Sequence, residues 1–525
     1  MKNTSNTTSH NSIIRTGRAG SSTRTCTLST LWIATLLLLC TVLGSSPALA
    51  KVVTVTNPND SGAGSLRTAL ASAATGDTVN FSFNFGTINL TKPLTITKSL
   101  TLSGPNTGYI GISGQNNVEV LIVNPGIVVN ISWLAIQNGN ANIGGCILND
   151  ATLTLTDVVV TACKNPMEMG GGIFNAGTLS LVSSTVTGNF AGPHNTYYGG
   201  GDNAQILGAG AGIFNYLGTL NVANTTISQN FTSGPLDGST QGGGGAGIFN
   251  YGGTVSVNNS TITQNYSSVG AGIENMAGTV AVTNTTFWGN SASGTGGAIE
   301  NESSGMLTVT NSTLAKNVAL ADPAQTIVAL PIPGSNSGSQ CPPSGCILAV
   351  GIIGGGGGLR NTGNASLTNV TITGNSVANA STGGGMANGG NLTVKNSLLA
   401  LNGEGNCNGS QYQIISQGHN LSDDMSCIGE FNNSLDLNDV AAGLDTAGLK
   451  NNGGTTLTVA LLATSRAVDA IPLSACTDTT GVQVKTDQRG TARPQGSACD
   501  IGAFEYVRPK VVIVPPGGPI EVAGK

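Results

Sequence analysis

Apolar and polar residues alternate with a period of two in short segments that recur along most of the chain. In TVSV (254–257) and its relatives the two valines or leucines point to one face, which is typical of a half-buried β-strand. Glycine, valine, threonine, serine and asparagine dominate these segments, and all five are poor helix formers. The pattern therefore predicts strands rather than amphipathic helices.

A Gly-rich phrase ending in asparagine precedes each alternating segment. It reads GGCILN (144–149), GGGIFN (170–175), GAGIFN (210–215 and 245–250), GAGIEN (270–275), GGAIEN (296–301), GGGLRN (356–361) and GGGMAN (383–388). A second asparagine follows 14 to 16 residues later, and the shortest steps between units are 25 to 27 residues. The second set is Asn165, Asn189, Asn230, Asn265, Asn290, Asn317, Asn375 and Asn402.

A fixed period of this length indicates a solenoid. The predicted fold class is all-β, a right-handed parallel β-helix with three short strands per coil and coils stacked about 4.8 Å apart. The asparagines are expected at turns, in left-handed backbone conformation, with side chains hydrogen-bonded along the stack. Some also stand in Asn-x-Ser/Thr sequences such as those at Asn259 and Asn284; glycosylation is the alternative role there, and turn geometry is preferred because it explains the whole column.

The regions on either side of the repeats divide the chain further. Residues 1–50 are expected to be a signal peptide, because basic residues precede an apolar run (31–44) and Ala48-Leu49-Ala50 forms a small-x-small cleavage site. Residues 51–143 are predicted to hold an N-terminal cap and first coils, with Ser65 capping a helix over 66–74. Repeats span 144–402, with insertions at about 192–208, 233–244 and 318–355. A C-terminal cap (403–507) and a Pro/Gly-rich tail (508–525) follow.

Charge and composition exclude several functions. Four basic and no acidic residues lie in 1–50, so the remaining chain has 16 basic against 25 acidic residues, a net charge of −9. That balance disfavours nucleic acid as a partner, and no second apolar run of membrane-spanning length follows. Only His194 and His419 follow the leader, so no metal site or cofactor is expected.

The eight cysteines after residue 50 fall into pairs that are close in sequence. For a secreted protein, structural disulfides are the expected use of such cysteines. The expected pairs are Cys146–Cys163, Cys341–Cys346, Cys407–Cys427 and Cys476–Cys499. Cys146 and Cys163 could instead be buried thiols.

One column of the repeat changes from coil to coil. The residue after the inward isoleucine should point outward, and it is Phe174, Phe214, Phe249, Glu274, Glu300 and Arg360 in turn. With Tyr216 and Tyr251 just beyond, the aromatic members form a candidate ligand-binding platform for sugar rings; burial under the insertions is the alternative.

The acidic members of this column are the candidate catalytic residues. Glu274 and Glu300 should lie one strand spacing apart, with Arg360 in the next coil. Retaining glycosidases use carboxylates about 5–5.5 Å apart, so catalysis is one interpretation. A surface ladder of charges is the simpler one.

Three phrases resemble known families. SGAGSLRTALASAATGDTVNF (61–81) resembles the N-terminal signature of secreted β-helix proteins of the CSLREA type, with Thr68 in place of the usual glutamate. The stretch 451–505 is similar to the end of choice-of-anchor Q proteins, with Arg466 in place of proline. GGAI (296–299) and FWGN (287–290) resemble the tetrapeptides of polymorphic outer-membrane adhesins. The resemblance implies a secreted or surface-displayed right-handed β-helix.

The sequence leaves three functions open. The preferred hypothesis is a non-enzymatic secreted or cell-surface protein that adheres to surfaces or binds a polysaccharide or cell-surface glycan. The alternatives are a polysaccharide lyase or glycoside hydrolase acting on extracellular polysaccharide, and a structural spacer of the cell envelope.

Overall fold

The computed structural model of the 525-residue chain describes residues 50–166, 169–192, 208–233, 243–320, 355–378, 383–409 and 414–509. The predicted leader up to residue 49, the Cys341–Cys346 pair, most of the three predicted insertions and the tail from residue 510 lie outside these ranges.

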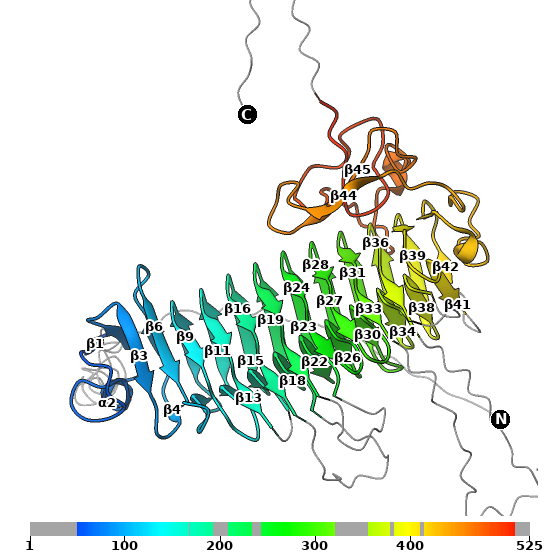
Figure 1. Ribbon diagram of the computed structural model, residues 1–525. Helices are drawn as coiled ribbons and strands as arrows, with labels where there is room; N and C mark the ends of the chain where they lie inside the picture. The colour runs from blue at the N-terminus through cyan, green and yellow to red at the C-terminus, as the bar shows by residue number, and fades with distance from the viewer. Residues whose placement is uncertain are drawn as a thin grey trace, which may run out of the picture. The chain divides into compact units, whose positions relative to one another are not determined.

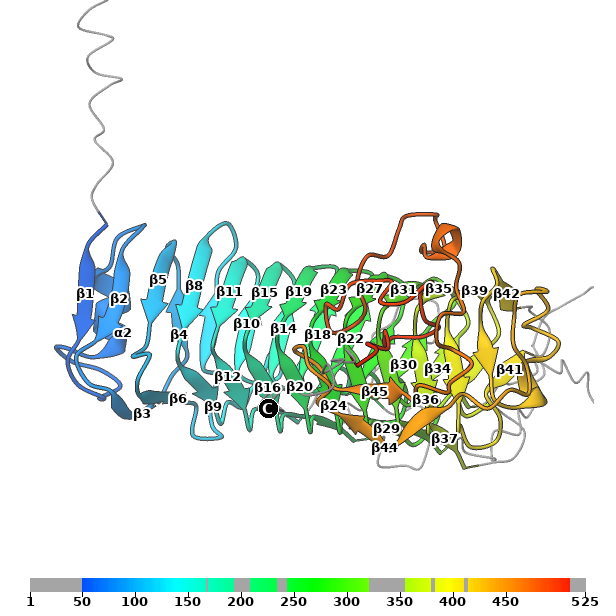
Figure 2. The ribbon, with the colours of Figure 1, turned by 90° about the horizontal axis from the view of Figure 1, so that it is seen from above.

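The described chain winds into a stack of coils in which each strand pairs in parallel with the equivalent strand of the next coil (Figures 1 and 2). Three long sheets result, which we name A, B and C, with 13, 12 and 11 strands. The predicted all-β parallel β-helix is confirmed. A fourth short strand, which the sequence pattern did not indicate, adds the seven-stranded sheet D.

Within each sheet the strands follow one another in chain order from the first coil to the last. Sheet A contains β1 (Val52–Val55), β2 (Thr78–Phe81), β5 (Leu100–Ser103), β8 (Val128–Ser132), β11 (Thr152–Thr156), β15 (Thr178–Val182), β19 (Thr219–Ala223), β23 (Thr254–Asn258), β27 (Thr279–Thr283), β31 (Met306–Thr310), β35 (Asn364–Thr368), β39 (Asn391–Lys395) and β42 (Ile414–Ser416). Sheet B contains β3 (Phe85–Asn89), β6 (Tyr109–Ser113), β9 (Ala135–Gln137), β12 (Val159–Thr161), β16 (Thr185–Thr187), β20 (Thr226–Ser228), β24 (Thr261–Thr263), β28 (Thr286–Trp288), β32 (Thr313–Ala315), β36 (Thr371–Thr373), β40 (Leu398–Ala400) and β43 (Leu421–Ser422). Sheet C contains β4 (Leu94–Ile96), β7 (Leu121–Val123), β10 (Ile147–Asn149), β14 (Ile173–Asn175), β18 (Ile213–Tyr216), β22 (Ile248–Tyr251), β26 (Ile273–Asn275), β30 (Ile299–Asn301), β34 (Leu359–Asn361), β38 (Met386–Asn388) and β41 (Cys407–Gly409). Sheet D contains β13 (Lys164–Asn165), β17 (Phe190–Ala191), β21 (Phe231–Thr232), β25 (Tyr266–Ser267), β29 (Ser291–Ala292), β33 (Val318–Ala319) and β37 (Ser376–Val377).

The alternating pattern places the core inside the coils. In β23, Val255 and Val257 are buried, whereas Thr254, Ser256 and Asn258 between and beside them are exposed. The equivalent positions of each coil stack on one another, so a continuous column of valine, leucine and isoleucine fills the interior. Burying these side chains is the main stabilising contribution, at roughly 25 cal/mol per Å² of apolar surface.

Two ladders of buried asparagines run parallel to the stacking direction. In the first, each Nδ2 donates to the Oδ1 of the next coil at 2.7–2.9 Å, through Asn149, Asn175, Asn215, Asn250, Asn275, Asn301, Asn361 and Asn388. The second makes the same bonds at 2.9–3.0 Å through Asn189, Asn230, Asn265, Asn290, Asn317, Asn375 and Asn402. The predicted hydrogen bonding along the stack is therefore present.

Two details of the asparagine prediction are wrong. The ladder asparagines do not have a positive φ; the left-handed asparagines form a third column between sheets A and B, at Asn224, Asn259, Asn284, Asn311, Asn369 and Asn396. Asn165 is not a ladder residue, because it lies opposite Ala191, and Cys163 occupies the ladder position instead. The backbone amide of Cys163 donates to Asn189 Oδ1 at 3.1 Å, so the ladder begins on a cysteine.

Three of the four expected disulfides are present in the described residues. They are Cys146–Cys163, Cys407–Cys427 and Cys476–Cys499. Cys146 and Cys163 are buried between the early coils, so the alternative of free buried thiols is wrong for this pair.

The short helix α2 (Leu66–Ser72) packs beside β1 at the first coil, and it starts where expected because Ser65 Oγ accepts a hydrogen bond from the amide of Thr68 at 3.3 Å. It ends two residues before the predicted limit. No helix in the described part of the chain is long and apolar enough to cross a membrane.

The chain after the last coil folds back over the turns between sheets A and B. It contains the 3₁₀-helices η1 (Met425–Cys427) and η2 (Leu473–Ala475) and the antiparallel pair β44 (Leu444–Lys450) and β45 (Thr458–Leu461) (Figure 1). Gln488 is buried at the centre of the contact, where it bonds to Thr286 and Thr313 of sheet B at 2.9 and 2.6 Å. This segment is hydrogen-bonded to later coils, at Asn284, Asn311 and Asn396.

Candidate functional site

The outward column on sheet C, proposed above as a ligand platform, is buried. Phe174, Phe214 and Phe249 lie side by side in register, but Phe214 is 0% exposed, Phe249 is 3% exposed and Phe174 is only partly exposed. The prediction that this column faces solvent is therefore wrong.

The glycines of the repeat explain why. In each coil the Gly-rich segment folds over the strand that it leads into. A Cβ on Gly245 would lie 2.7 Å from Phe249 Cα, and a Cβ on Gly210 would lie 2.8 Å from Phe214 Cβ. Both glycines also have a positive φ, which favours glycine. The glycines therefore allow a close backbone approach that covers the outward side chain.

Stacking of the aromatic rings on one another also argues against a ligand-binding platform on sheet C. The ring centroids of Phe174 and Phe214 are 5.5 Å apart at 6°, and those of Phe214 and Phe249 are 4.9 Å apart at 17°. Tyr216 and Tyr251 stack in the same way at 5.6 Å, although Tyr216 is 40% exposed. Because these rings face one another from coil to coil along sheet C, their faces are not free to contact a sugar ring.

Glu274, Glu300 and Arg360 are neighbours in register, as predicted, but Glu274 and Glu300 are buried and Arg360 is only partly exposed. Arg360 forms an ion pair with Glu300. Within the described residues, Glu274 Oε2 and Glu300 Oε2 have no hydrogen-bond partner. The backbone at Gly244 lies directly against the Glu274 carboxyl and that at Gly296 against Glu300.

Burial controls the ionisation of this pair. It raises the pKa of Glu274 well above its ordinary value, and the carboxylates of Glu302 and Glu300 raise it further. It raises the pKa of Glu300 to about 7, against the lowering effect of Arg360. A raised pKa is common at catalytic sites. Glu300 is fully buried, however, so a polysaccharide bond has no access to its carboxyl group.

The charge on Glu274 is expected to destabilise the fold at high pH. Its folded-state pKa is above the unfolded value, so the folded state holds the extra proton and stability falls as pH rises through the interval between the two values. We expect Glu274→Gln to raise the free energy of unfolding by at least about 1 kcal/mol at pH 8, with the gain shrinking towards pH 5. Denaturant unfolding at both pH values measures this.

The exposed Glu404 provides the matched control for that experiment, because Glu404→Gln changes the net charge equally without altering a buried group. A gain for Glu274→Gln that is the same at pH 5 and pH 8 would show that the carboxylate charge is not the cause.

Exposed aromatic side chains without a stacking partner occur at the other end of the stack. Phe85 is 71% exposed, Tyr109 is 49% exposed and Trp133 is 39% exposed, and none of them stacks on another ring in the described residues. Phe85 lies opposite Tyr109 in the pairing of β3 with β6, and Trp133 stands two residues before β9, the strand that pairs with β6 on the next coil. These three residues, which we call the aromatic strip, come from three successive coils.

Trp133 occupies a strained position. It is the first residue of the turn between β8 and β9 and has a φ of 54°, in the left-handed region. The equivalent turn residues of the later coils are mostly asparagine, which tolerates this conformation, with Asp157 and Ser183 in the next two coils. Tryptophan here carries a backbone cost, and such strain concentrates at functional sites.

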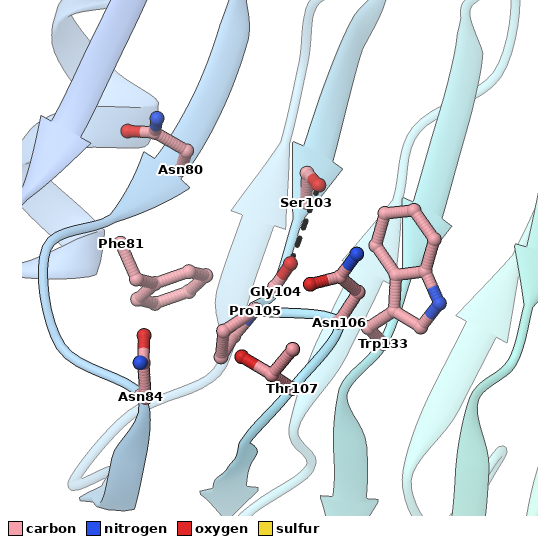
Figure 3. Close-up of a pocket in the computed structure, with 9 residues that line it drawn as sticks. All are labelled: Asn80, Phe81, Asn84, Ser103, Gly104, Pro105, Asn106, Thr107 and Trp133. Carbon is pink, nitrogen blue, oxygen red and sulfur yellow. Dashed lines mark hydrogen bonds between the residues drawn. The ribbon is translucent and has the colours of Figure 1, made fainter.

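A pocket of about 380 Å³ opens beside Trp133 (Figure 3). It lies at the turns between sheets A and B in three successive coils, where β2 leads to β3, β5 to β6 and β8 to β9. The first two turns are longer than the third, which leaves the hollow between them. Its lining consists of Asn80, Phe81, Asn84, Ser103, Gly104, Pro105, Asn106, Thr107 and Trp133.

The close-up shows Phe81 and Trp133 on opposite sides of the pocket, with the side chains of Asn84, Asn106 and Thr107 between or below them (Figure 3). Five of the nine lining residues carry an amide or a hydroxyl group, so the pocket offers hydrogen-bonding groups between two aromatic side chains. In the described ranges no group of three or more histidine, cysteine or acidic side chains is arranged to hold a metal ion.

The sequence did contain a signal for Trp133. In NISWLAI (130–136) a tryptophan stands where the later coils SVNNSTI (256–262) and AVTNTTF (281–287) have asparagine, so alignment on the second half of the repeat shows the exception. Phe81, Asn84 and Asn106 had no such signal, because the first coils lack the Gly-rich phrase and their turns differ in length.

Comparisons with known proteins found weak structural similarity and no sequence match. No protein-family model matches the chain, and a search of curated proteins found no match. Among solved structures, pectate lyase Pel9A resembles it with 13% identity and a TM-score of 0.43, over 87% of this chain and 96% of the other. ORF18 of Geobacillus virus E2 resembles it with 14% identity and a TM-score of 0.28, over 55% of this chain and 61% of the other. At these scores the likeness carries no conclusion about function.

Proposed function

We propose that this protein is an extracellular, non-catalytic β-helix that binds a glycan at the aromatic strip and the adjoining pocket, and that this binding attaches it to a polysaccharide or cell surface. The observation that carries the proposal is the aromatic strip itself. Exposed aromatic side chains that gather on neighbouring coils form an apolar patch, and such patches mark interaction sites; within the described residues these rings stack neither on one another nor on other rings.

The geometry of the strip suits an extended ligand. An aromatic face offers apolar contact to the C–H face of a sugar ring, and the pairing of β3 with β6 places Phe85 and Tyr109 one strand spacing, about 4.8 Å, apart. The pocket beside Trp133 adds amide and hydroxyl groups that can bond to ring hydroxyls. An extracellular location is supported by the disulfides, which persist in oxidising compartments, and by the resemblance of the two chain ends to secreted β-helix proteins.

The alternative of a lyase or hydrolase has less support. Its candidate residues Glu274 and Glu300 are buried under the Gly-rich segments, and neither the aromatic strip nor the lining of its pocket includes a carboxylate. The role of an envelope spacer does not explain the exposed rings.

The test is binding of the purified protein to immobilised polysaccharides, with a parallel assay for release of reducing ends. We expect binding without release, and we expect the double variant Phe85→Ala, Tyr109→Ala to lower the affinity at least tenfold, about 1.4 kcal/mol. Both side chains are exposed, so the fold should be unaffected.

Phe231→Ala is the matched control, because Phe231 is also exposed but stacks in the ladder of sheet D with Phe190 and Tyr266. Equal losses of affinity for the control and the double variant would place binding elsewhere, and release of reducing ends would favour the enzyme.

A further inference from the structure

We propose that the aromatic strip and its pocket select neutral glycans and reject chains rich in uronate or sulfate. This inference rests on the proposed function, since it names the ligand class of the same site. The supporting observation is that the side chains lining the pocket are uncharged but include several hydrogen-bonding groups.

The pocket has no charged side chain in its described lining. Its polar groups are the three asparagine amides and the hydroxyls of Ser103 and Thr107, and the remainder are Phe81, Trp133 and the Gly104-Pro105 floor. Along the strip, Phe85 is apolar and the Tyr109 hydroxyl donates to Gln137 Oε1 at 2.9 Å. The charged neighbour is the exposed Asp157, at the equivalent turn of the coil after Trp133, and its negative charge also disfavours an anionic ligand.

The charged residues of the coils that form the pocket do not line it. Only four occur between residues 77 and 137. Asp77 accepts hydrogen bonds from the amides of Lys51 and Ala74, both at 2.8 Å, and Lys98 donates to the carbonyls of Ala71 and Ala73. Glu119 is buried, and burial raises its pKa to about 8. Lys92 is absent from the pocket lining.

An uncharged set of donors and acceptors matches hydroxyl groups rather than carboxylates. A carboxamide supplies both an acceptor oxygen and donor hydrogens, and a sugar hydroxyl also both donates and accepts, so the two satisfy one another. A carboxylate or sulfate accepts only, and moving it from water to an aromatic site is unfavourable without a cation to pair with it. The chain after residue 50 is net negative, which adds long-range repulsion of such ligands.

The inference predicts salt independence. Attraction between unlike charges weakens as ionic strength rises, because the Debye length falls from about 10 Å at 0.1 M salt to about 3 Å at 1 M. Binding of a neutral glycan through ring faces and amides should therefore change by less than about twofold over this range.

The experiment compares neutral and acidic polysaccharides on the same protein. Affinity electrophoresis or calorimetry with neutral glucan, galactan and xylan is set beside polygalacturonate and alginate, for the native protein and for Trp133→Ala. We expect affinity for at least one neutral polymer, at least tenfold weaker or no affinity for both acidic polymers, and loss of binding in Trp133→Ala.

A charge variant supplies the second measurement. Asn106 is exposed in the pocket lining, so Asn106→Lys should fold normally and gain salt-sensitive affinity for polygalacturonate. Asn258→Lys adds the same charge at an exposed position of sheet A and should gain none.

The outcomes separate the two proposals. Binding of the native protein to polygalacturonate or alginate as tightly as to any neutral polymer, lost in Trp133→Ala, would overturn the neutral-ligand inference and leave glycan binding intact. Failure to bind every polymer would overturn the proposed function, and the ligand class with it.

Discussion

Replacing Asn275 by alanine is expected to lower the free energy of unfolding by about 3 kcal/mol. Asn275 is fully buried in the first asparagine ladder: its Nδ2 donates to Asn301 Oδ1 and its Oδ1 accepts from Asn250 Nδ2, both at 2.8 Å. Alanine leaves Asn301 Oδ1 without this donor and Asn250 Nδ2 without this acceptor. Each unsatisfied buried group costs about 1–3 kcal/mol. Equilibrium denaturation in urea measures the change.

The control is Asn258→Ala, since Asn258 is exposed on the outer face of sheet A and belongs to neither ladder. A surface substitution of this kind should change stability by less than about 0.5 kcal/mol. Should Asn275→Ala cost no more than Asn258→Ala, the ladder would contribute register rather than stability.

Replacing Trp133 by asparagine is expected to lower glycan affinity at least tenfold without lowering stability. The substitution installs the residue type that later coils use at the same left-handed turn, and asparagine adopts that conformation at less cost. We expect the free energy of unfolding to stay the same or rise by about 1 kcal/mol. Binding and denaturation are measured on the same preparation, so that loss of affinity cannot be attributed to unfolding.

Leu217→Asn is the matched control for Trp133→Asn. Leu217 is also an exposed apolar residue with a positive φ, 54°, but it lies at the turn between sheets C and A. This variant should gain stability to a similar degree and keep full glycan affinity. If Trp133→Asn is less stable than the native protein, the indole contributes packing that outweighs the backbone strain. If the variant keeps its glycan affinity, Trp133 is not part of the binding site.

The repeat pattern predicted the coil correctly and its outer surface wrongly. Alternation in β23 and the recurring Gly-rich phrase were sufficient to predict parallel stacked strands and the alignment of Phe214 with Phe249 and of Glu274 with Glu300. The prediction that these residues face solvent assumed that outward from the sheet means outward from the protein. In the structure the glycines of the same phrase bring the backbone across the strand, so a second layer covers the column.

The register of the early coils shows the same limit. Asn165 looked like a ladder residue because its spacing from Asn149 fits the repeat, but a shift of two residues along the strand keeps the same face and spacing alone does not detect it. Only the pairing of Lys164 with Phe190 shows that Cys163 takes the ladder position.

Spacing and alternation were enough to predict the period, the fold class and the inward residues, because these features arise within a single coil or between neighbours in sequence. Proximity in sequence also suggested three cysteine pairs that the structure contains, although it left free thiols open for Cys146 and Cys163. The exposure of side chains became known from the folded stack alone, and so did the meeting of residues in the first coils, which lack the repeated phrase. Phe85, Tyr109 and Trp133 are 24 residues apart from one to the next and lack any common phrase, yet the coiling of the chain places all three, exposed, on successive coils at one end of the stack. The exposure of a side chain depends on which other parts of the chain pack against it. Such packing is a property of the folded stack and cannot be read from the local sequence pattern.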